Sequence, residues 1–181
     1  MGQSPPGNTY NQIADGLPFY QGRVDFGFRF PLRRVFCTKP TRFAEVGDTL
    51  VSVRAPVGDI NMAGERCSVG RGVAAIRHCS GSRSFTYYSM HHQRHQFEQF
   101  EAEGTVFGAI NKKDFELLPF ITPSPTISAA FDRSVSTIDK KIEINEQQRS
   151  TLESLRDNLL PKLISGKIRI REAETFLESR L

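Results

Sequence analysis

Two stretches in the front half of the chain are rich in β-branched and small apolar residues, as strands are. Val46 to Val57 and Val69 to Ile76 are predicted strands, and Gly58-Asp59 and Gly64-Glu65 are typical of the turns between strands. Phe85 to Phe100 has the length and the apolar spacing of a helix. The front half is therefore predicted to be a mixed α+β domain.

A different pattern follows the proline-containing break from Thr122 to Pro125. Apolar residues then recur mostly at steps of four and three, which favours one long helix from about Ser128 to Ser165, ended by Gly166, with Lys162 in its last turn. The stripe comprises Phe131, Val135, Ile138, Ile142, Leu152, Leu155, Leu159 and Leu163. The predicted organisation is a globular domain of residues 1–123, then residues 124–181 with the long helix and a short tail.

A helix of this length is on the order of 55 Å long, too long to bury its whole stripe against a domain of that size. Part of the stripe is therefore expected to face a second helix in an oligomer or a larger assembly. The stripe becomes polar at Asn145 and Arg149. Two interpretations of this interruption are open: it sets the register of a coiled coil, or the helix bends there and the polar side chains face water.

Composition adds a modest positive charge that is unevenly placed. The chain has 24 Lys and Arg against 20 Asp and Glu, a formal charge of +4. Six basic residues fall in one short stretch that contains a single carboxylate, Asp25: Arg23, Arg29, Arg33, Arg34, Lys39 and Arg42. This suits a polyanionic partner, although a small positive balance is also typical of an ordinary solvated surface.

No apolar run approaches the roughly 20 residues of a membrane span, and the first residues lack a basic and an apolar leader region. The sequence is therefore interpreted as that of a soluble cytoplasmic protein with no membrane partner. Cys37, Cys67 and Cys79 are odd in number and widely spaced, which favours reduced thiols over disulfides or a zinc site.

Three fragments resemble catalytic or cofactor motifs and fail on inspection. Gly70 to Ala75 fits a loose GxGxxA pattern, but a short strand follows it where a dinucleotide site needs a helix. His91 and His95 share a helical spacing, but the glutamate of HExxH and a third ligand are missing. Ser4 to Gly7 lacks the amide or acid and the aromatic residue of the methyltransferase tetrapeptide. The prediction is a non-catalytic protein without metal or cofactor.

Several segments, in order, resemble a known family. GQSPPGNTYN (2–11), GLPFYQG (16–22), GDTLVSVRAPVGDINMA (47–63) and SVGRGVAAIR (68–77) are similar to the target-recognition domain of specificity subunits from type I restriction-modification systems. GAINKKDFELLPF (108–120) resembles the close of that domain, and LRDNLLPKLISGKIRI (155–170) resembles the family's spacer region. The resemblance covers nearly the whole chain.

The resemblance implies a protein that binds double-stranded DNA, docks two methylation subunits and joins a restriction subunit through them, while catalysing nothing itself. The usual subunit has two recognition domains and two long helices that pair antiparallel, each domain reading one half of a bipartite site. This chain carries one of each. It is therefore interpreted as a half-subunit or a truncated product, and a homodimer or pairing with another half-subunit would restore the helix pair.

Candidate DNA contacts follow from the side chains that read base edges or hold phosphates. The polar segment Ser82 to Arg94 is the predicted base reader, and a solvated helix face is its alternative. Two glycine-bounded loops are further candidates, against a simple turn for the first and a strand end with a packed tyrosine for the second. The candidates in these segments are Arg83, Tyr87, Tyr88, His91, His92, Gln93, Arg94, Gln3, Ser4, Tyr10, Asn11, Tyr20, Gln21 and Arg23.

Four further cations complete the set. Arg54 stands among valines and Arg71 between two glycines, where a charge is costly without a partner; the partner is either DNA phosphate or an internal carboxylate, Asp48 or Asp59. Lys112 and Lys113 follow Asn111, a predicted helix cap, and are expected to meet phosphate. The competing hypothesis is a non-catalytic interaction scaffold whose helix pairs with a partner and whose front domain binds a ligand other than DNA.

Overall fold

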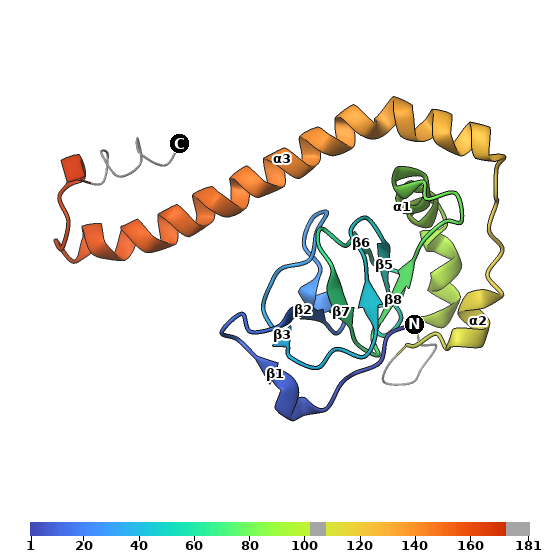
Figure 1. The fold of residues 1–181 in the computed structure, drawn as a ribbon, viewed down its shortest axis with the longest axis horizontal. Coiled ribbons are helices and arrows are strands. Elements are labelled where there is room, and N and C mark those ends of the chain that lie inside the picture. The colour runs from blue at the N-terminus through green and yellow to red at the C-terminus, as the bar shows by residue number, and fades with distance from the viewer. Residues whose placement is uncertain (102–107, 173–181) are drawn as a thin grey trace. The chain divides into compact units, whose positions relative to one another are not determined.

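The computed structural model describes residues 1–101 and 108–172 (Figure 1). The chain divides into two compact units after Asp139. The front unit is a β domain with helices. The back unit begins inside the long helix.

The front unit contains two small sheets. The first has the strand order β1-β3-β2-β7-β4, in which β2 and β7 are parallel and the other pairs are antiparallel. The second is antiparallel with the order β6-β5-β8. The strands are β1 (Tyr10–Asn11), β2 (Leu17–Tyr20), β3 (Phe36–Cys37), β4 (Phe43–Ala44), β5 (Thr49–Ser52), β6 (Ile60–Met62), β7 (Cys67–Val69) and β8 (Val73–Ile76).

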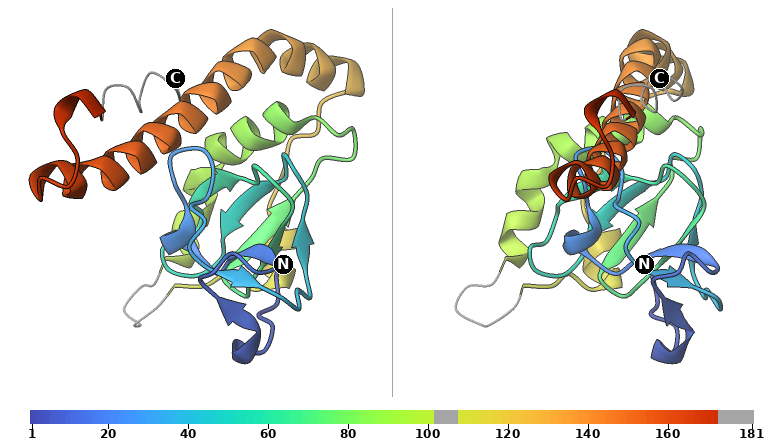
Figure 2. Two further views of the ribbon diagram at one scale, coloured as in Figure 1. Left: turned by 60° about the vertical axis from the view of Figure 1, so that its left-hand side comes forward. Right: turned by 90° about the vertical axis from the view of Figure 1, so that its left-hand side faces the viewer.

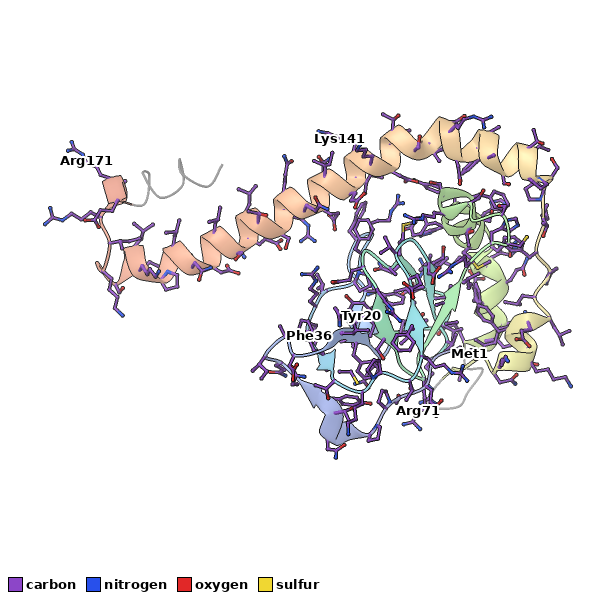
Figure 3. The ribbon with its side chains drawn as sticks, viewed as in Figure 1. Met1, Tyr20, Phe36, Arg71, Lys141 and Arg171 are labelled. Carbon is purple, nitrogen blue, oxygen red and sulfur yellow. The ribbon has the colours of Figure 1, made fainter. Side chains whose placement is uncertain are left out.

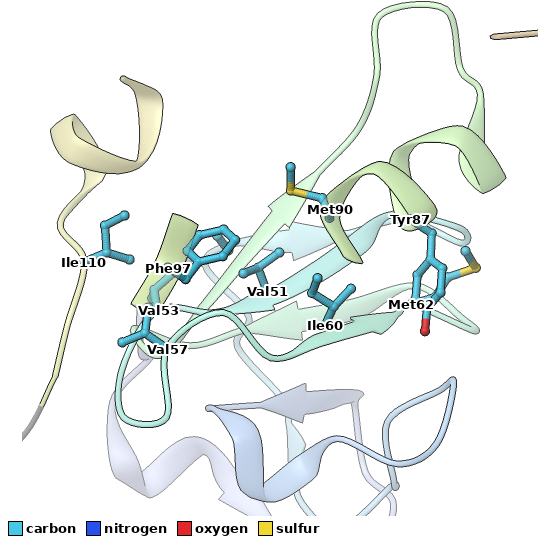
Figure 4. Close-up of a cluster of buried hydrophobic side chains, with 10 residues drawn as sticks. Val51, Val53, Val57, Ile60, Met62, Tyr87, Met90, Phe97 and Ile110 are labelled. Carbon is cyan, nitrogen blue, oxygen red and sulfur yellow. The ribbon is translucent and has the colours of Figure 1, made fainter. Parts of the chain in front are cut away.

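Strand β5 is buried on both faces, and its side chains alternate between two cores as a period of two requires. Leu50 joins Tyr20, Val69 and Val73 in a core shared by the two sheets. Val51 lies in the other core, with Met90 and Phe97 from the helical segment that follows β8 (Figure 4). The second sheet is therefore held between the first sheet and this helical cover.

Among the described residues, four helical segments follow β8 in sequence, and two short 3₁₀ turns lie earlier in the chain. α1 (Arg83–His92) contacts β5 and β6 and continues into the 3₁₀ segment η3 (Arg94–Phe100), so together they cover one face of the second sheet (Figure 2). α2 (Lys112–Glu116) is a short helix, and η1 (Gly7–Thr9) and η2 (Arg23–Asp25) are 3₁₀ turns. α3 runs from Pro125 to Ile164.

The expected long helix is confirmed, and it begins three residues earlier than predicted. Proline suits the first helical position because the N–H it lacks would have no partner there. At the other end Gly166 adopts a φ of 68°. Lys167 N donates to Lys162 O at 2.9 Å and Gly166 N to Leu163 O at 3.1 Å, the paired bonds of a Schellman motif.

The mixed α+β class is also confirmed, but the predicted strands are too long. Only Thr49–Ser52 of the first stretch is a strand, because the chain turns from Val53 to Asp59. The second stretch is two strands, β7 and β8, separated by the turn Gly70–Gly72. The predicted helix from Phe85 changes to 3₁₀ geometry after His92.

All three cysteines are free thiols, as predicted. Cys37 and Cys67 are buried and Cys79 is exposed. Burial raises the pKa of the Cys67 thiol to about 12, which leaves it protonated at neutral pH.

Candidate nucleic-acid interface

One end of the front unit collects cations from distant parts of the sequence. Strands β2, β5 and β7 finish at this end, and β6 and β8 start there, as the strand pairing dictates. The segment before α2 joins the same end, because Ile110 N donates to Val53 O at 3.0 Å. The cations are Arg23, Arg54, Arg71, Arg94 and Lys112, and we call this surface the basic end.

A tight turn presents Arg71. Gly70 N donates to Tyr20 O at 2.8 Å, and Gly72 O accepts from Val53 N at 2.9 Å. A Cβ on Gly72 would lie 2.2 Å from the backbone oxygen of Gln21, so only glycine fits against that segment. The turn is thus fixed by backbone contacts on both sides, while the Arg71 side chain is exposed.

The first residues of the chain pack against the same turn. Gly2 N donates to Val73 O at 2.9 Å, Gln3 N to Val69 O at 3.0 Å, and the Ser4 hydroxyl accepts from Arg71 N at 3.2 Å. Met1 and Arg71 consequently lie at the same end of the front unit (Figure 3). This places the predicted contacts Gln3 and Ser4 beside Arg71.

Lys112 and Arg42 extend the positive surface around Met1. Burial lowers the pKa of the Met1 amine, and the positive charges of Lys112 and Arg42 lower this pKa further, which shows that both cations lie near it. Val69 N also donates to Arg42 O at 3.0 Å. Arg42 was absent from the sequence-predicted contacts, and only the strand pairing brings it here.

Asp59 is the carboxylate that organises one side of the basic end. It accepts hydrogen bonds from both Arg23 and Arg94, residues 71 positions apart. Its side chain is 14% exposed, whereas the Arg23 and Arg94 side chains are 46% and 59% exposed. One carboxylate thus orients two arginines and leaves a net positive charge.

Arg54 and Arg71 do not pair with Asp48 or Asp59, which was the internal alternative for them. Asp48 instead forms a two-bond ion pair with Arg77, at 2.6 and 2.8 Å, and Asp59 binds Arg23 and Arg94. Within residues 1–101 and 108–172, neither Arg54 nor Arg71 makes an ion pair. Both residues are exposed.

Three predicted contacts are corrected by burial. Tyr20, Tyr87 and Gln93 are 2%, 5% and 7% exposed, so their side chains are parts of the interior and not of a reading surface. The two tyrosines belong to the hydrophobic cores described above, and the packed-tyrosine alternative holds for Tyr20.

Two more predicted contacts are used in local structure. The Tyr10 hydroxyl donates to Pro5 O at 2.6 Å, and its ring lies 4.7 Å from that of Phe19. Asn11 Oδ1 accepts from Ile13 N and Asp15 N, which closes the turn after β1. For Tyr10 and Asn11 the structure therefore supports the simple-turn alternative.

The predicted base-reading segment on α1 is mostly engaged in packing. Tyr88 bonds to Arg29 and Asp139, and the His91 ring packs 4.6 Å from that of Tyr87. Partial desolvation of the His91 ring, together with the positive charges of Arg29 and Arg94, lowers the pKa of His91. Of the predicted set, Arg83, His91, His92 and Arg94 have exposed side chains, and Arg83 lies against Gly47, at the opposite end of β5 from the basic end.

α2 behaves as predicted at its start. Asn111 Oδ1 accepts from Asp114 N at 2.9 Å, so the N-cap is confirmed. Lys112 pairs with Glu116 at 3.6 Å with both side chains largely exposed, and Lys113 is exposed as well. An exposed pair of this kind is weak and readily exchanged for a phosphate.

The basic stretch between Arg23 and Arg42 is not a single polyanion site. Arg29 is buried and paired with Asp139, and Arg33 pairs with Glu65. Arg34 donates to Val24 O at 3.0 Å. From the sequence this stretch suits a polyanionic partner or an ordinary solvated surface, and tertiary packing divides it between the interior, an ion pair and the basic end.

The stripe on α3 differs in exposure along its length. Phe131, Ile138 and Leu152 are 36%, 58% and 53% exposed; Val135, Ile142, Leu155 and Leu163 are half-buried; Leu159 is 9% exposed. The helix is unbroken through Asn145 and Arg149, and Arg149 pairs along the helix with Glu146 and Glu153. The polar interruption therefore stabilises the helix itself.

The described residues form neither a metal site nor a membrane-spanning helix. No group of three His, Cys, Asp or Glu lies close enough there to hold a metal ion. None of the described helices has both the length and the apolar composition that a membrane span needs.

Sequence comparison and structure comparison both find similarity to specificity subunits of type I restriction systems. The chain is 35% identical over 173 residues to the MjaX type I restriction enzyme specificity subunit of Methanocaldococcus jannaschii, a match covering 94% of this chain and 40% of that one. It is similar in structure to the HsdS subunit from Thermoanaerobacter tengcongensis, with a TM-score of 0.64 and 34% identity over 90% of this chain and 41% of that one. No family model matches.

A third similarity supports the fold alone. The S subunit of a type I restriction-modification system from M. genitalium is 18% identical, with a TM-score of 0.64 over 91% of this chain and 42% of that one. In each of these comparisons the chain spans about two fifths of the longer protein.

Proposed function

We propose that this chain, a relative of the type I restriction specificity subunits in sequence and fold, binds double-stranded DNA and reads one half of a bipartite site. In this role it is non-catalytic and acts in the cytoplasm, where it supplies sequence specificity to methylation and restriction subunits. The basic end is the DNA-binding surface. Positively charged side chains there hold phosphates and bring neighbouring polar groups to base edges.

The observation that carries the proposal is that Arg54 and Arg71 are exposed and make no ion pair within residues 1–101 and 108–172. Backbone contacts on both sides fix the main chain of Arg71, so little backbone entropy is lost when its side chain binds an anion. Gln3, Ser4 and Gln21 lie beside the same turn and supply hydrogen-bonding groups. Arginine with neighbouring amides and hydroxyls is the combination that reads and positions DNA.

Binding to a duplex of about 30 base pairs, followed by fluorescence anisotropy between about 50 and 200 mM salt, tests the proposal. Each phosphate neutralised contributes about −0.9 to the slope of log K against log salt, so four or five contacts give a slope of about −4. A chain that is folded and dimeric but shows no salt-dependent binding, alone and with methylation subunits, would favour the interaction scaffold instead.

The long helix suits a second role, the pairing of two chains. Its exposed apolar side chains, such as Leu152, lack a covering element among the described residues of the back unit. A second copy of this chain, or another half-subunit, would cover them and bring two recognition domains to one DNA. Sedimentation equilibrium tests this, because a monomer at micromolar concentration would contradict the pairing.

Docking of methylation subunits completes the proposal. One similar solved structure, with a TM-score of 0.59 and 36% identity over 90% of this chain and 42% of that chain, comes from work on complex assembly in a type I restriction-modification system. We assign the docking surface to α3, with the restriction subunit joining through the methylation subunits. Co-purification with methylation subunits, lost in a variant lacking residues 140–181, is the expected result.

A further inference from the structure

The end of the front unit opposite the basic end contains a buried arginine. Arg29 is 5% exposed, and its backbone oxygen accepts from Met62 N of β6 at 2.9 Å. Its guanidinium lies 4.1 Å from the centre of the Tyr87 ring. One nitrogen donates to Asp139 at 3.0 Å and another to the Tyr88 hydroxyl at 2.9 Å. A charge so placed is stable only because its partners are fixed around it.

Asp139 is the acceptor at the centre of this network. It accepts from Arg29, from the Tyr88 hydroxyl at 2.8 Å and from the Ser84 hydroxyl. The three donors come from two segments, the loop before β3 and helix α1. One carboxylate therefore ties α3 to two other parts of the front unit.

A second carboxylate of α3, seven residues earlier on the same helix face, also binds α1. Asp132 Oδ1 accepts from Phe85 N at 2.9 Å, in the first turn of α1. A carboxylate there satisfies an N–H that lacks a helical partner and complements the helix dipole. Phe131 packs edge-on against Phe85 and Tyr88, with ring centres 6.1 and 6.0 Å apart. Polar and aromatic contacts thus hold the first four turns of α3.

Apolar packing alone lets one helix slide or rotate on another at small cost, whereas hydrogen-bonded charges have one favourable arrangement. We propose that Arg29 and Asp139, together with the two hydroxyls that donate to Asp139, are positioning residues, and that this network fixes the register and orientation of residues 125–139 of α3 on the recognition domain. This rests on the proposed function for its purpose, because a domain that reads half a bipartite site must be held in a defined orientation to the helix that pairs two such chains.

Pulsed electron paramagnetic resonance between two spin labels on the full chain tests the proposal. The labels are placed at exposed Ser136 of α3 and exposed Lys39, each replaced by Cys in a Cys79→Ser background. The expected distance distribution is narrow in this background, and broader or shifted in Asp139→Asn and in Arg29→Met. The matched control is Glu65→Gln, which breaks the exposed Arg33 pair and is expected to leave the distribution unchanged.

An unchanged narrow distribution in folded Asp139→Asn would overturn the proposal. If Asp139→Asn and Arg29→Met do not fold, the double variant Ser84→Ala, Tyr88→Phe decides, because it removes two hydroxyl donors to Asp139 and keeps the ion pair. A broadened distribution in that variant supports positioning by the network, and an unchanged one contradicts it.

The DNA measurement separates this proposal from the function it rests on. Asp139→Asn should bind non-specific duplex within about twofold of the parent, because the basic end lies at the other end of β5. Arg54→Ala, Arg71→Ala should weaken binding and leave the distance distribution narrow. A chain that binds no DNA yet shows the broadened distribution in Asp139→Asn would refute the DNA function and leave the positioning role standing.

Discussion

Arg71 and Arg29 lie toward opposite ends of the second sheet and differ in almost every physical respect. Arg71 is exposed on a tight turn and makes no ion pair among the described residues, whereas Arg29 is buried beneath two tyrosines and bonded to Asp139. Arg29 belongs to the basic stretch of the sequence, whereas Arg71 stands alone between two glycines. The comparison shows that the surroundings of a cation, and not its place in a basic stretch, decide whether it serves the fold or a ligand.

The same contrast holds for the carboxylates. At the basic end Asp59 binds two largely exposed arginines and leaves positive charge over. At the opposite end of the second sheet Asp139 accepts from one buried arginine and two hydroxyls, so most of its acceptor sites are used within the fold. Substitutions at the two ends should therefore separate cleanly into effects on stability and effects on binding.

The largest effect is expected from Asp139→Ala. It leaves the Arg29 guanidinium buried without its ion-pair partner, which costs about 3 kcal/mol in such cases. Urea unfolding followed by circular dichroism measures the loss. Glu65→Ala, which breaks an exposed pair, should change the free energy of unfolding by less than about 0.5 kcal/mol. Equal losses in both variants would mean that the bonds around Asp139 stabilise the fold no more than an exposed ion pair does.

A smaller loss, about 2 kcal/mol, is expected from Gly72→Ala. The new Cβ would lie 2.2 Å from the Gln21 backbone oxygen, and the backbone of one of the two segments must shift to relieve this contact. Gly7→Ala is the control, since nothing lies within 4 Å of the position of its added Cβ. Gly72→Ala should also reduce DNA affinity by moving Arg71. Wild-type stability in Gly72→Ala would contradict the tight packing of this turn.

Tyr88→Phe should cost about 1.5 kcal/mol. The change keeps the ring against Phe131 but removes a hydroxyl that donates to Asp139 and accepts from Arg29. Thermal unfolding measures the loss, and Tyr10→Phe, which removes a hydroxyl that donates to Pro5 O and touches no buried charge, is a matched comparison. If Tyr10→Phe were the more destabilising of the two, the network would contribute less than its bonds indicate.

The features predicted correctly from the sequence depend on neighbouring residues. The long helix follows from apolar spacing and ends at Gly166, where a left-handed residue is needed, and Asn111 caps α2 three residues from its partner. The sequence also singles out Arg54 and Arg71, because charges amid small and apolar residues need a partner, and DNA as that partner stays a prediction.

The features missed depend on contacts between distant residues. Arg23 and Arg94 meet on Asp59, and Arg29 meets Asp139 across 110 positions, through tertiary contacts that no local pattern shows. Tyr20, Tyr87 and Gln93 resemble DNA-contacting residues in a list of residue types, yet packing buries them. Residue type predicts what a side chain can bind, and only tertiary structure shows whether it is accessible.

The smallest effect on stability is expected where the effect on binding is clearest, in Arg54→Ala, Arg71→Ala. Neither guanidinium is paired in the described part of the chain, so the free energy of unfolding should stay within about 0.5 kcal/mol of wild type. The slope of log K against log salt should fall in magnitude by about 1.8, from two lost phosphate contacts. Arg156→Ala, at an exposed pair on α3, should leave both quantities unchanged. A destabilised double variant with an unchanged slope would reverse the assignment and make these arginines part of the fold.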